Sequence, residues 1–187
     1  MTKLELPSPL VPSSTLMKSL VRIAPSYGAP ILDAPCGFGR NALALAARGY
    51  HVVAVDRDID RLRFIENSAA NSFRFDRPSN ACGRISSVCA DLSTKRLPFA
   101  KSSFSAVICV HYPVQTIISD LDAAVQKGGH FYIETFGGQG QNYLELPKAG
   151  EIRDALAGYD FHFYKERQVG PPSQNSVTVR ALGRKRL

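Results

Sequence analysis

Residues 31–56 read ILDAPCGFGRNALALAARGYHVVAVD, and this stretch decides the fold. It begins as an apolar strand at Ile31, breaks into a turn that contains Gly37 and Gly39, and continues as a helix rich in alanine and leucine. A second apolar strand follows and ends in Asp56. A strand–turn–helix–strand unit forms a crevice for a small molecule, because the turn exposes backbone N–H groups at a helix N-terminus and the next strand brings a carboxylate beside them.

The rest of the chain continues the alternation of helices and strands. A first helix, capped by Ser13 or Ser14, is expected to run to about Ala24. Further helices are expected within residues 41–48, 59–70, 114–125 and 150–158, and strands are expected from Pro30 and over residues 51–55, 84–90, 104–110, 130–135, 160–169 and 176–182. Residues 71–83, 127–129 and 137–147 are expected to be loops or turns. This order predicts an α/β fold with a parallel sheet covered on both faces, closed by an antiparallel hairpin.

Length and composition indicate one domain. A chain of 187 residues, 44% of them hydrophobic, is large enough for a single good core. We expect an extended N-terminal arm over residues 1–12, one domain over residues 13–183, and a basic tail over residues 184–187.

The sequence also limits the compartment and the partners. No apolar run approaches the roughly 18 residues that a membrane span needs, and the N-terminus does not resemble a signal peptide. The four cysteines, at positions 36, 82, 89 and 109, include no Cys-x-x-Cys pair and have no nearby histidine at metal-ligand spacing. These features predict a reduced, cytoplasmic protein without a metal site and without membrane contact.

The net charge of +7 favours anionic partners. The basic residues are nevertheless scattered, and their one dense cluster is Arg184 to Arg186 at the C-terminal end. A nucleic-acid partner is therefore an alternative that the sequence does not favour.

Three carboxylates follow the ends of predicted strands, where open α/β sheets bind their ligands. Each has a physical role if the ligand is an adenosine with a zwitterionic amino-acid tail. Asp33 can pair with an ammonium group, directly or through water, and Asp56 can accept hydrogen bonds from both ribose hydroxyls. Asp91 can accept a hydrogen bond from the adenine amine, while Leu92 covers the ring. The two glycines of the first turn let the backbone approach the ligand closely.

The stretch over residues 30–136 resembles the class I S-adenosylmethionine-dependent methyltransferases. The motifs that carry the resemblance are LDAPCGFG at 32–39, VAVD at 53–56, CADL at 89–92 and KGG at 127–129. The pattern DxxCGxGRN, followed by an alanine and leucine helix, is most similar to the tellurite-resistance-type branch of that family. The resemblance implies a Rossmann-like, seven-stranded, mostly parallel sheet with a reversed last strand, helices on both faces, and S-adenosylmethionine as the cofactor.

The resemblance also implies which residues bind the cofactor: Asp33, Ala34, Pro35, Cys36, Gly37, Gly39, Arg40, Asp56, Arg57, Asp91, Leu92 and His111. One position departs from the family, which commonly has a glycine where this chain has Pro35. The turn here has a fixed φ and one fewer N–H donor. Arg40 is a candidate for binding the cofactor carboxylate or an anionic acceptor, with a salt bridge to a surface acid as an equal alternative.

A nicotinamide cofactor is the competing interpretation of the same stretch. Residues 37–42 also fit the pattern Gly-x-Gly-x-x-Gly/Ala, and Asp56 follows at a distance suited to a ribose. In that case Asp33 would stand beside a pyrophosphate, which is electrostatically unfavourable, and Asp91 would have no required role. A protein that binds S-adenosylmethionine without catalysis is a further alternative.

Two residues after the predicted strand 104–110 are candidates for catalysis. His111 can serve as a general base or can line the adenine side of the site, and Tyr112 follows it directly. In the loop after the next strand, Asn142 and Tyr143 can form an acceptor wall or can be ordinary solvated residues. The residues do not identify the methyl acceptor.

The short chain has no added substrate-recognition domain, so we expect a methyltransferase, monomeric or homodimeric, that acts on a small molecule. The alternative is an RNA or protein methyltransferase that uses the basic surface. Methyl transfer is an in-line displacement that depends mainly on alignment and on exclusion of water, so the function does not require an unambiguous base.

Overall fold

The structure is a computed structural model that describes residues 10–23, 29–72, 83–94, 97–138 and 140–187. Most of the expected N-terminal arm, the expected helix end at Ala24 and most of the expected loop over residues 71–83 lie outside the described residues. Within the described part, no helix combines the length and the apolar character that a membrane crossing requires.

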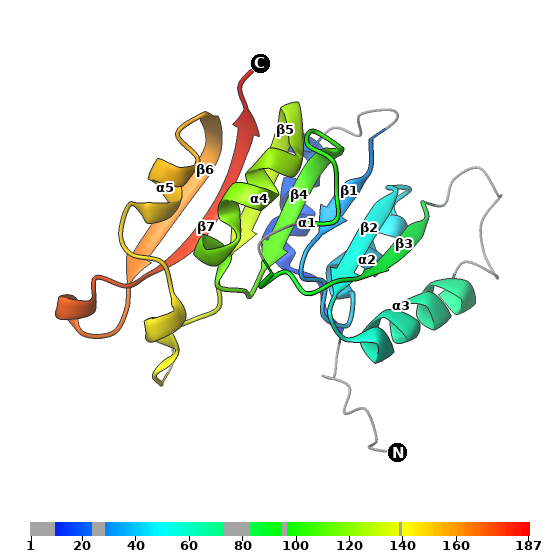
Figure 1. The fold of residues 1–187 in the computed structure, drawn as a ribbon, viewed down its shortest axis with the longest axis horizontal. Coiled ribbons are helices and arrows are strands. Elements are labelled where there is room, and N and C mark those ends of the chain that lie inside the picture. The colour runs from blue at the N-terminus through cyan, green and yellow to red at the C-terminus, as the bar shows by residue number, and fades with distance from the viewer. Residues whose placement is uncertain (1–9, 24–28, 73–82, 95–96, 139) are drawn as a thin grey trace.

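Helices and strands alternate along the chain (Figure 1). The strands are β1 (Ile31–Asp33), β2 (Val52–Asp56), β3 (Ile85–Cys89), β4 (Phe104–Val110), β5 (Val125–Glu134), β6 (Tyr159–Gln168) and β7 (Val177–Lys185). The α-helices are α1 (Ser14–Ser19), α2 (Arg40–Ala46), α3 (Ile59–Ser72), α4 (Ile118–Ala124) and α5 (Glu151–Ala155). Short 3-10 turns span Leu20–Arg22, Val114–Thr116, Asn142–Glu145 and Pro172–Gln174.

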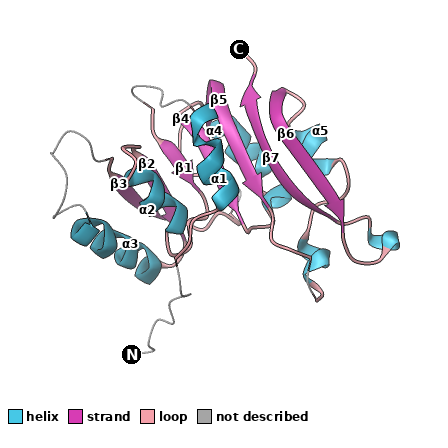
Figure 2. Cartoon of the chain, turned by 180° about the vertical axis from the view of Figure 1, so that it is seen from behind, coloured by secondary structure: helices cyan, strands magenta, loops and turns pink. Residues whose placement is uncertain are grey.

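The strands form one seven-stranded sheet in the order β3-β2-β1-β4-β5-β7-β6 (Figure 2). The strands from β3 to β5 pair in parallel, and β7 runs antiparallel to both β5 and β6. This confirms the predicted fold, with β7 as the reversed last strand. Because β6 and β5 both oppose β7, the carboxyl ends of β1 to β6 meet at the same edge of the sheet.

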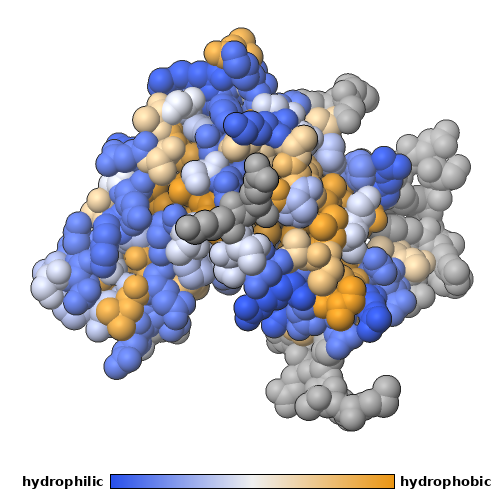
Figure 3. All heavy atoms as spheres, viewed as in Figure 1, coloured by the Kyte–Doolittle hydropathy of each residue, from blue (hydrophilic) through white to orange (hydrophobic). Residues whose placement is uncertain are grey.

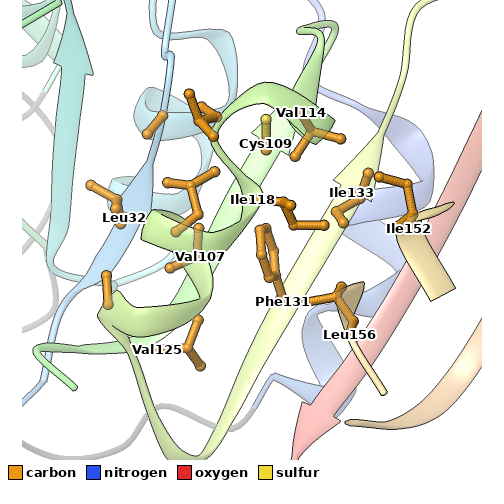
Figure 4. Close-up of a cluster of buried hydrophobic side chains, with 14 of the residues drawn as sticks. Leu32, Val107, Cys109, Val114, Ile118, Val125, Phe131, Ile133, Ile152 and Leu156 are labelled. Carbon is orange, nitrogen blue, oxygen red and sulfur yellow. The ribbon is translucent and has the colours of Figure 1, made fainter. Parts of the chain in front are cut away.

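Two hydrophobic clusters cover the two faces of the sheet. One cluster joins β4 and β5 to α4 and α5, with Phe131, Ile118 and Ile152 at its centre (Figure 4). The other joins the opposite face to α1, α2 and α3 through residues such as Leu16 and Leu45. Every residue of β4 is buried, as expected for a central strand covered on both faces. The face of the molecule shown in Figure 3 is mostly hydrophilic, with several separate hydrophobic patches.

The predicted turn at Lys127–Gly129 is wrong, because these residues lie inside β5. The pairing passes from Phe104 opposite Val125 to Ala106 opposite His130, so β5 uses three more residues than β4 over this interval. The extra residues form a bulge, and Gly128 at φ +74° supplies the backbone conformation that the bulge needs. The sequence indicated a break in the strand correctly but did not show that the strand continues through it.

Three further boundaries differ from expectation. The helix expected over residues 114–125 is divided at Ile117 into a 3-10 turn and α4, and the loop over residues 137–147 contains a 3-10 turn. The residues expected as a basic tail are largely part of the sheet. Arg184 and Lys185 belong to β7 and pair with residues of the neighbouring strands. The Arg186 Nε donates a hydrogen bond to Asp160 Oδ1 at 2.9 Å. Their backbone hydrogen bonds explain the difference, because the antiparallel pairing with β6 extends to Tyr159.

Candidate functional site

A cavity of about 510 Å³ opens at the carboxyl ends of β1, β2, β3 and β4. Ligand pockets commonly have volumes of roughly 300–1,000 Å³, so this cavity can accommodate a nucleoside with an amino-acid tail. Nine of the predicted cofactor residues line it: Pro35, Cys36, Gly37, Arg40, Asp56, Arg57, Asp91, Leu92 and His111. The candidate catalytic residue Tyr112 lines it as well. The predicted residues Asp33, Ala34 and Gly39 do not belong to the lining.

Asp56 organises the centre of the cavity. Its side chain is almost fully buried, and its Oδ2 accepts a hydrogen bond from the backbone N–H of Gly37 at 2.9 Å. Its Oδ1 accepts a hydrogen bond from the N–H of Asp58 at 3.0 Å. Each carboxylate oxygen can accept more than one hydrogen bond, so Asp56 can hold the glycine turn and still accept a bond from a ligand.

The two glycines of the turn serve different purposes. A Cβ added to Gly37 would meet no atom within 4 Å, and Gly37 lines the cavity at φ +56°. A Cβ added to Gly39, at φ +71°, would stand 2.5 Å from the Ile65 Cγ1 of α3. Gly37 therefore keeps space open beside the cavity. Gly39 lets the turn pack against α3, which corrects the expectation that both glycines serve the approach to the ligand.

Pro35 does not leave the turn without hydrogen bonds. The N–H of Ala34 before it donates to Ile108 O at 3.0 Å, and the N–H of Cys36 after it donates to Val55 O at 2.7 Å. Both bonds lead to neighbouring strands of the sheet. The departure from the family pattern is therefore compatible with an ordered turn.

Asp33 lies behind the cavity wall, at the end of β1. It is 1% exposed, and neither carboxylate oxygen has a hydrogen-bond partner in the described part of the chain. Burial raises the pKa of Asp33 to about 7, although the nearby N–H of Ala42 and the charge of Arg40 favour the ionised form. A nearby cation stabilises a buried carboxylate that has no other partner, so Asp33 fits the ammonium group of an amino-acid tail.

Asp91 and Leu92 line the cavity just after the end of β3. Asp91 Oδ1 accepts hydrogen bonds from the Ser93 N–H at 2.9 Å and the Ser93 Oγ at 2.7 Å, and these bonds lower the pKa of Asp91. Leu92 is buried beside it. An ionised acceptor next to an apolar surface suits an adenine ring, which offers an amine donor and a hydrophobic face.

His111 and Arg40 contact each other across the cavity mouth, where Arg40 Nη2 lies 3.2 Å from His111 Nδ1. A guanidinium can only donate, so His111 Nδ1 must be the acceptor and the neutral ring carries its proton on Nε2. Burial and the charge of Arg40 lower the pKa of His111, and Arg180 acts in the same direction against the opposing charge of Glu134. His111 is therefore neutral near pH 7 and presents a donor rather than a base.

A second cavity, of about 600 Å³, adjoins the first. It lies at the carboxyl ends of β5 and β6 and the start of β7, and His111 lines both cavities. Glu134 stands between the cavity and the N-terminal segment: its Oε2 accepts hydrogen bonds from Ser13 Oγ and from Tyr132 OH, and its Oε1 accepts one from Arg180 Nη2 at 2.8 Å. Burial raises the pKa of Glu134, but these contacts outweigh it and hold the pKa below its ordinary value.

Sequence reasoning missed several residues of the first cavity: Leu10, Phe38, Asn41, Arg61, Ala90 and Val110. Arg61 of α3 stacks over the Phe38 ring at 5.3 Å and places its Nη1 3.8 Å from Asp56 Oδ2. Its position in the first turn of α3, directly after the segment that follows Asp56, is a signal that could have found it. Asn142 and Tyr143 line neither of the two cavities.

Known proteins resemble this chain over the region that forms the first cavity. A family model described as a methyltransferase domain matches residues 31–129. No curated protein matches the chain.

Solved structures share the fold at low sequence identity. The TehB structure from Haemophilus influenzae is 18% identical, with a TM-score of 0.67 over 92% of this chain and 62% of that chain, so this chain spans less than two thirds of TehB. A structure of S-adenosylmethionine-dependent methyltransferases from Methanosarcina mazei is 18% identical, with a TM-score of 0.63 over 90% of this chain and 97% of that chain. Magnesium protoporphyrin IX methyltransferase from Synechocystis, with bound S-adenosylmethionine, is 16% identical, with a TM-score of 0.63 over 91% and 78% of the two chains.

Proposed function

The chain belongs to the methyltransferase domain family, and we propose that it transfers the methyl group of S-adenosylmethionine to a small-molecule acceptor bound beside His111. The class I methyltransferase fold and the cofactor predicted from the sequence are confirmed by the family match and the seven-stranded sheet. The acceptor and the roles of individual residues are our proposal.

One observation carries the proposal: His111 lines both the 510 Å³ cavity and the 600 Å³ cavity. Methyl transfer needs the donor and the acceptor in two sites that meet at the reacting carbon, and it gains most of its rate from their alignment. Two adjoining cavities with one shared side chain supply this arrangement. A protein that only binds the cofactor has no need of the second cavity.

The proposed cofactor site uses the whole length of the first cavity. Asp56 binds the ribose hydroxyls, Asp91 and Leu92 hold the adenine, and Asp33 favours the ammonium group from behind the glycine turn. Arg40 lies where it can bind the carboxylate of the amino-acid tail. When bound, S-adenosylmethionine supplies a methyl group already activated by its sulfonium.

The proposed role of His111 and Tyr112 is to position the acceptor. The Nε2–H of His111 can donate a hydrogen bond to an acceptor atom, while its Nδ1 is occupied by Arg40. Burial raises the pKa of Tyr112, so its phenol also stays protonated near pH 7. In this arrangement neither side chain removes a proton. We therefore favour an acceptor that is already nucleophilic near neutral pH.

The RNA alternative was motivated by the basic C-terminal cluster. Lys185 Nζ forms an ion pair with Asp122 at 2.9 Å and Arg186 forms one with Asp160, so two of the three cations are neutralised. Arg184 stands opposite His130 in the pairing of β7 with β5, and neither residue lines either cavity. The cluster therefore lends the RNA alternative little support, and a small-molecule acceptor is the function we propose.

A thermal-shift panel with S-adenosylmethionine, S-adenosylhomocysteine and NADH tests the cofactor site. A ligand at 100 times its dissociation constant is expected to stabilise the folded chain by about 2.7 kcal/mol. We expect this shift with the first two ligands, its loss in Asp56→Ala, and its retention in Asp60→Ala, whose carboxylate is exposed on α3. Stabilisation by NADH alone would overturn the proposed function.

Transfer of a labelled methyl group tests the acceptor class. We expect label to enter low-molecular-weight products when the enzyme is incubated with a fractionated metabolite extract. Label that enters only RNA or protein would contradict the small-molecule proposal.

A further inference from the structure

We propose that the second cavity binds its acceptor through an anionic group, a carboxylate or a phosphate, held by Lys165 and Arg167 of β6. The inference rests on the proposed function, because it names the chemical class of the acceptor. It also concerns a binding site of its own, which can be tested without methyl transfer.

One row of charges crosses the sheet beneath this cavity. Glu134 of β5 stands directly opposite Arg180 of β7, and Arg180 stands directly opposite Lys165 of β6. Like charges directly opposite each other destabilise a pair of strands. Two cations and one carboxylate therefore leave this row with an excess of one positive charge.

The carboxylate of this row already accepts hydrogen bonds from three other residues. Glu134 accepts hydrogen bonds from Ser13, Tyr132 and Arg180, and the Arg180 contact, at 2.8 Å, is its ion pair. Glu134 therefore offsets Arg180, and among the described residues its ion pair is with Arg180 and not with Lys165.

Arg167 adds a second cation on the same face of β6, because residues two apart in a strand point to the same side. Within the part of the chain that the structure describes, neither Lys165 nor Arg167 forms an ion pair. The intervening Glu166 also borders the cavity, but its Oε1 accepts hydrogen bonds from Tyr164 OH and from the N–H of Gly150. These two bonds hold the carboxylate of Glu166 away from the two cations.

The two cations suit an anionic group in different ways. A guanidinium presents a planar fork that matches the two oxygens of a carboxylate or phosphate, whereas an ammonium acts as a compact charge. Thr178 stands opposite Arg167, and its Oγ1 donates to the Arg167 carbonyl at 3.3 Å, so the backbone that carries the guanidinium is held in place.

The position of the cations also gives the acceptor an orientation. His111 borders the cavity where it meets the cofactor cavity, and Lys165 and Arg167 border it from β6, with β5 and β7 between them in the sheet. An acceptor bound by its anionic end to β6 would point its other end toward His111. The anionic group therefore anchors the acceptor, and the methyl group is transferred to an atom at its other end.

Isothermal titration with inorganic phosphate and with acetate tests the anion site directly. The variant is Lys165→Gln with Arg167→Gln, and the matched control is Lys101→Gln with Arg48→Gln, which removes the same charge from positions that line neither cavity. We expect the dissociation constant of the tighter-binding anion to rise at least about tenfold in the variant and to stay unchanged in the control. Which of phosphate and acetate binds more tightly distinguishes the two anionic groups.

Two results would overturn the inference. Equal weakening in the variant and the control would mean that the anion senses only the overall charge. Unchanged binding in the variant would mean that it binds elsewhere.

A single-stranded RNA oligonucleotide provides the comparison with a polyanion. RNA binding that is lost in the variant, falls steeply with salt, and is not displaced by phosphate or acetate would assign the cations to nucleic acid and overturn the inference. Displacement of the RNA by the small anion would support it.

The affinity of both variants for S-adenosylmethionine separates this inference from the proposed function. We expect it to be the same as in the wild type, because neither Lys165 nor Arg167 lines the cofactor cavity. Failure of the wild type to bind the cofactor would count against the proposed function alone, because the phosphate titration does not depend on it.

Discussion

Asp33 is a buried carboxylate that has no hydrogen-bond partner among the described residues. Its pKa is raised to about 7 by burial, against an ordinary value of 3.8 that applies when the chain is unfolded. Between these values the folded state holds a proton that the unfolded state has released. The contribution of Asp33 to stability is therefore fully present below about pH 4 and is lost as the pH rises to about 7.

Replacing Asp33 by asparagine should separate stability from cofactor binding. At pH 8 we expect Asp33→Asn to stabilise the cofactor-free protein by roughly 1–3 kcal/mol, because a buried charge without a partner is removed. At pH 4 the gain should disappear. The same change should weaken S-adenosylmethionine binding about tenfold, because the nearby negative charge that favours the ammonium group is lost. Urea unfolding at the two pH values and calorimetric titration measure both effects.

Proton release gives an independent check on Asp33. If the cofactor ammonium ionises this carboxyl, binding between about pH 5 and pH 7 should release a proton from the wild type and none from Asp33→Asn. Calorimetry in buffers of different ionisation enthalpy counts that proton. Equal release by both proteins would remove Asp33 from the ammonium site.

Replacement by alanine should have different effects at Gly37 and at Gly39. Gly37→Ala puts a methyl group into open space at φ +56°, so it should cost about 1–2 kcal/mol of stability and weaken S-adenosylmethionine binding more than tenfold. Gly39→Ala brings the same backbone strain and drives a Cβ against Ile65, so its stability cost should reach about 2–4 kcal/mol. Denaturant unfolding and thermal shift with cofactor compare the two. The interpretation fails if Gly39→Ala is the milder change in stability.

At the scale of elements, α1 fastens the N-terminal segment to the carboxyl edge of the sheet. Ser13 caps α1 by accepting a hydrogen bond from the Leu16 N–H at 3.2 Å, and its Oγ donates to Glu134 of β5. The N–H of Ser13 donates to Asn41 Oδ1 of α2 at 3.0 Å. One residue thus joins three elements beside the cofactor cavity, where Leu10 forms part of the wall.

Ser13→Ala should therefore cost more than loss of a helix cap alone. We expect about 2 kcal/mol of destabilisation, since a cap contributes about 1 kcal/mol and the bond to an ionised Glu134 adds a similar amount. The pKa of Glu134 should rise when this donor is lost. Ser14→Ala, at an exposed neighbouring position, is the control and should change stability by less than about 0.5 kcal/mol. Equal effects of the two changes would contradict the role given to Ser13.

The strands and helices were predictable where local pattern and tertiary environment agree. The seven apolar or small residues of β4 are buried throughout, and the alanine and leucine run after Gly39 forms α2. The pattern fails where pairing overrides local signals. Gly128 and Gly129 read as a turn, yet the bulge keeps them within β5, and Arg184 and Lys185 read as a solvated tail, yet they continue β7.

The residues of the candidate site likewise include some that the sequence predicts and some that it does not. Asp56 and Asp91 were predictable because each follows a strand of its own, and strand ends converge at one edge of the sheet. Lys165 and Arg167 were not predictable as neighbours of His111, because only the strand order places β6 on that side of the sheet. The hydrogen bond between Arg40 and His111 joins residues 71 positions apart and likewise leaves no local pattern.

At the scale of the whole molecule, the two edges of the sheet at which its strands end have different functions. Both cavities open at the carboxyl edge, whereas β7 runs back from that edge and ends at the opposite one, where the C-terminus lies (Figure 1). Lys185 there stands opposite Tyr159, forms an ion pair with Asp122, and donates a hydrogen bond to Asp122 O at 2.7 Å. Cations at this edge stabilise the sheet and do not border the ligand sites.

Removing residues 184–187 should consequently affect stability and spare cofactor binding. The truncation deletes the last pairs of β7 with β5 and β6, the half-buried Lys185–Asp122 ion pair and the hydrogen bond to Asp160. Loss of about three net hydrogen bonds should lower stability by about 3 kcal/mol, or the melting temperature by about 6–12 °C for a chain of this size. Below the lowered melting temperature, affinity for S-adenosylmethionine should match that of the wild type.

Charge removal without truncation provides the control. Arg184→Gln with Arg186→Gln keeps the backbone of β7 and removes two exposed cations, so the melting temperature should fall by much less than in the truncated protein. If the truncated protein instead keeps its stability and loses cofactor affinity, the C-terminal residues belong to the ligand site and not to the sheet. Thermal unfolding followed by circular dichroism, with calorimetric titration at a temperature where all three proteins are folded, decides between these outcomes.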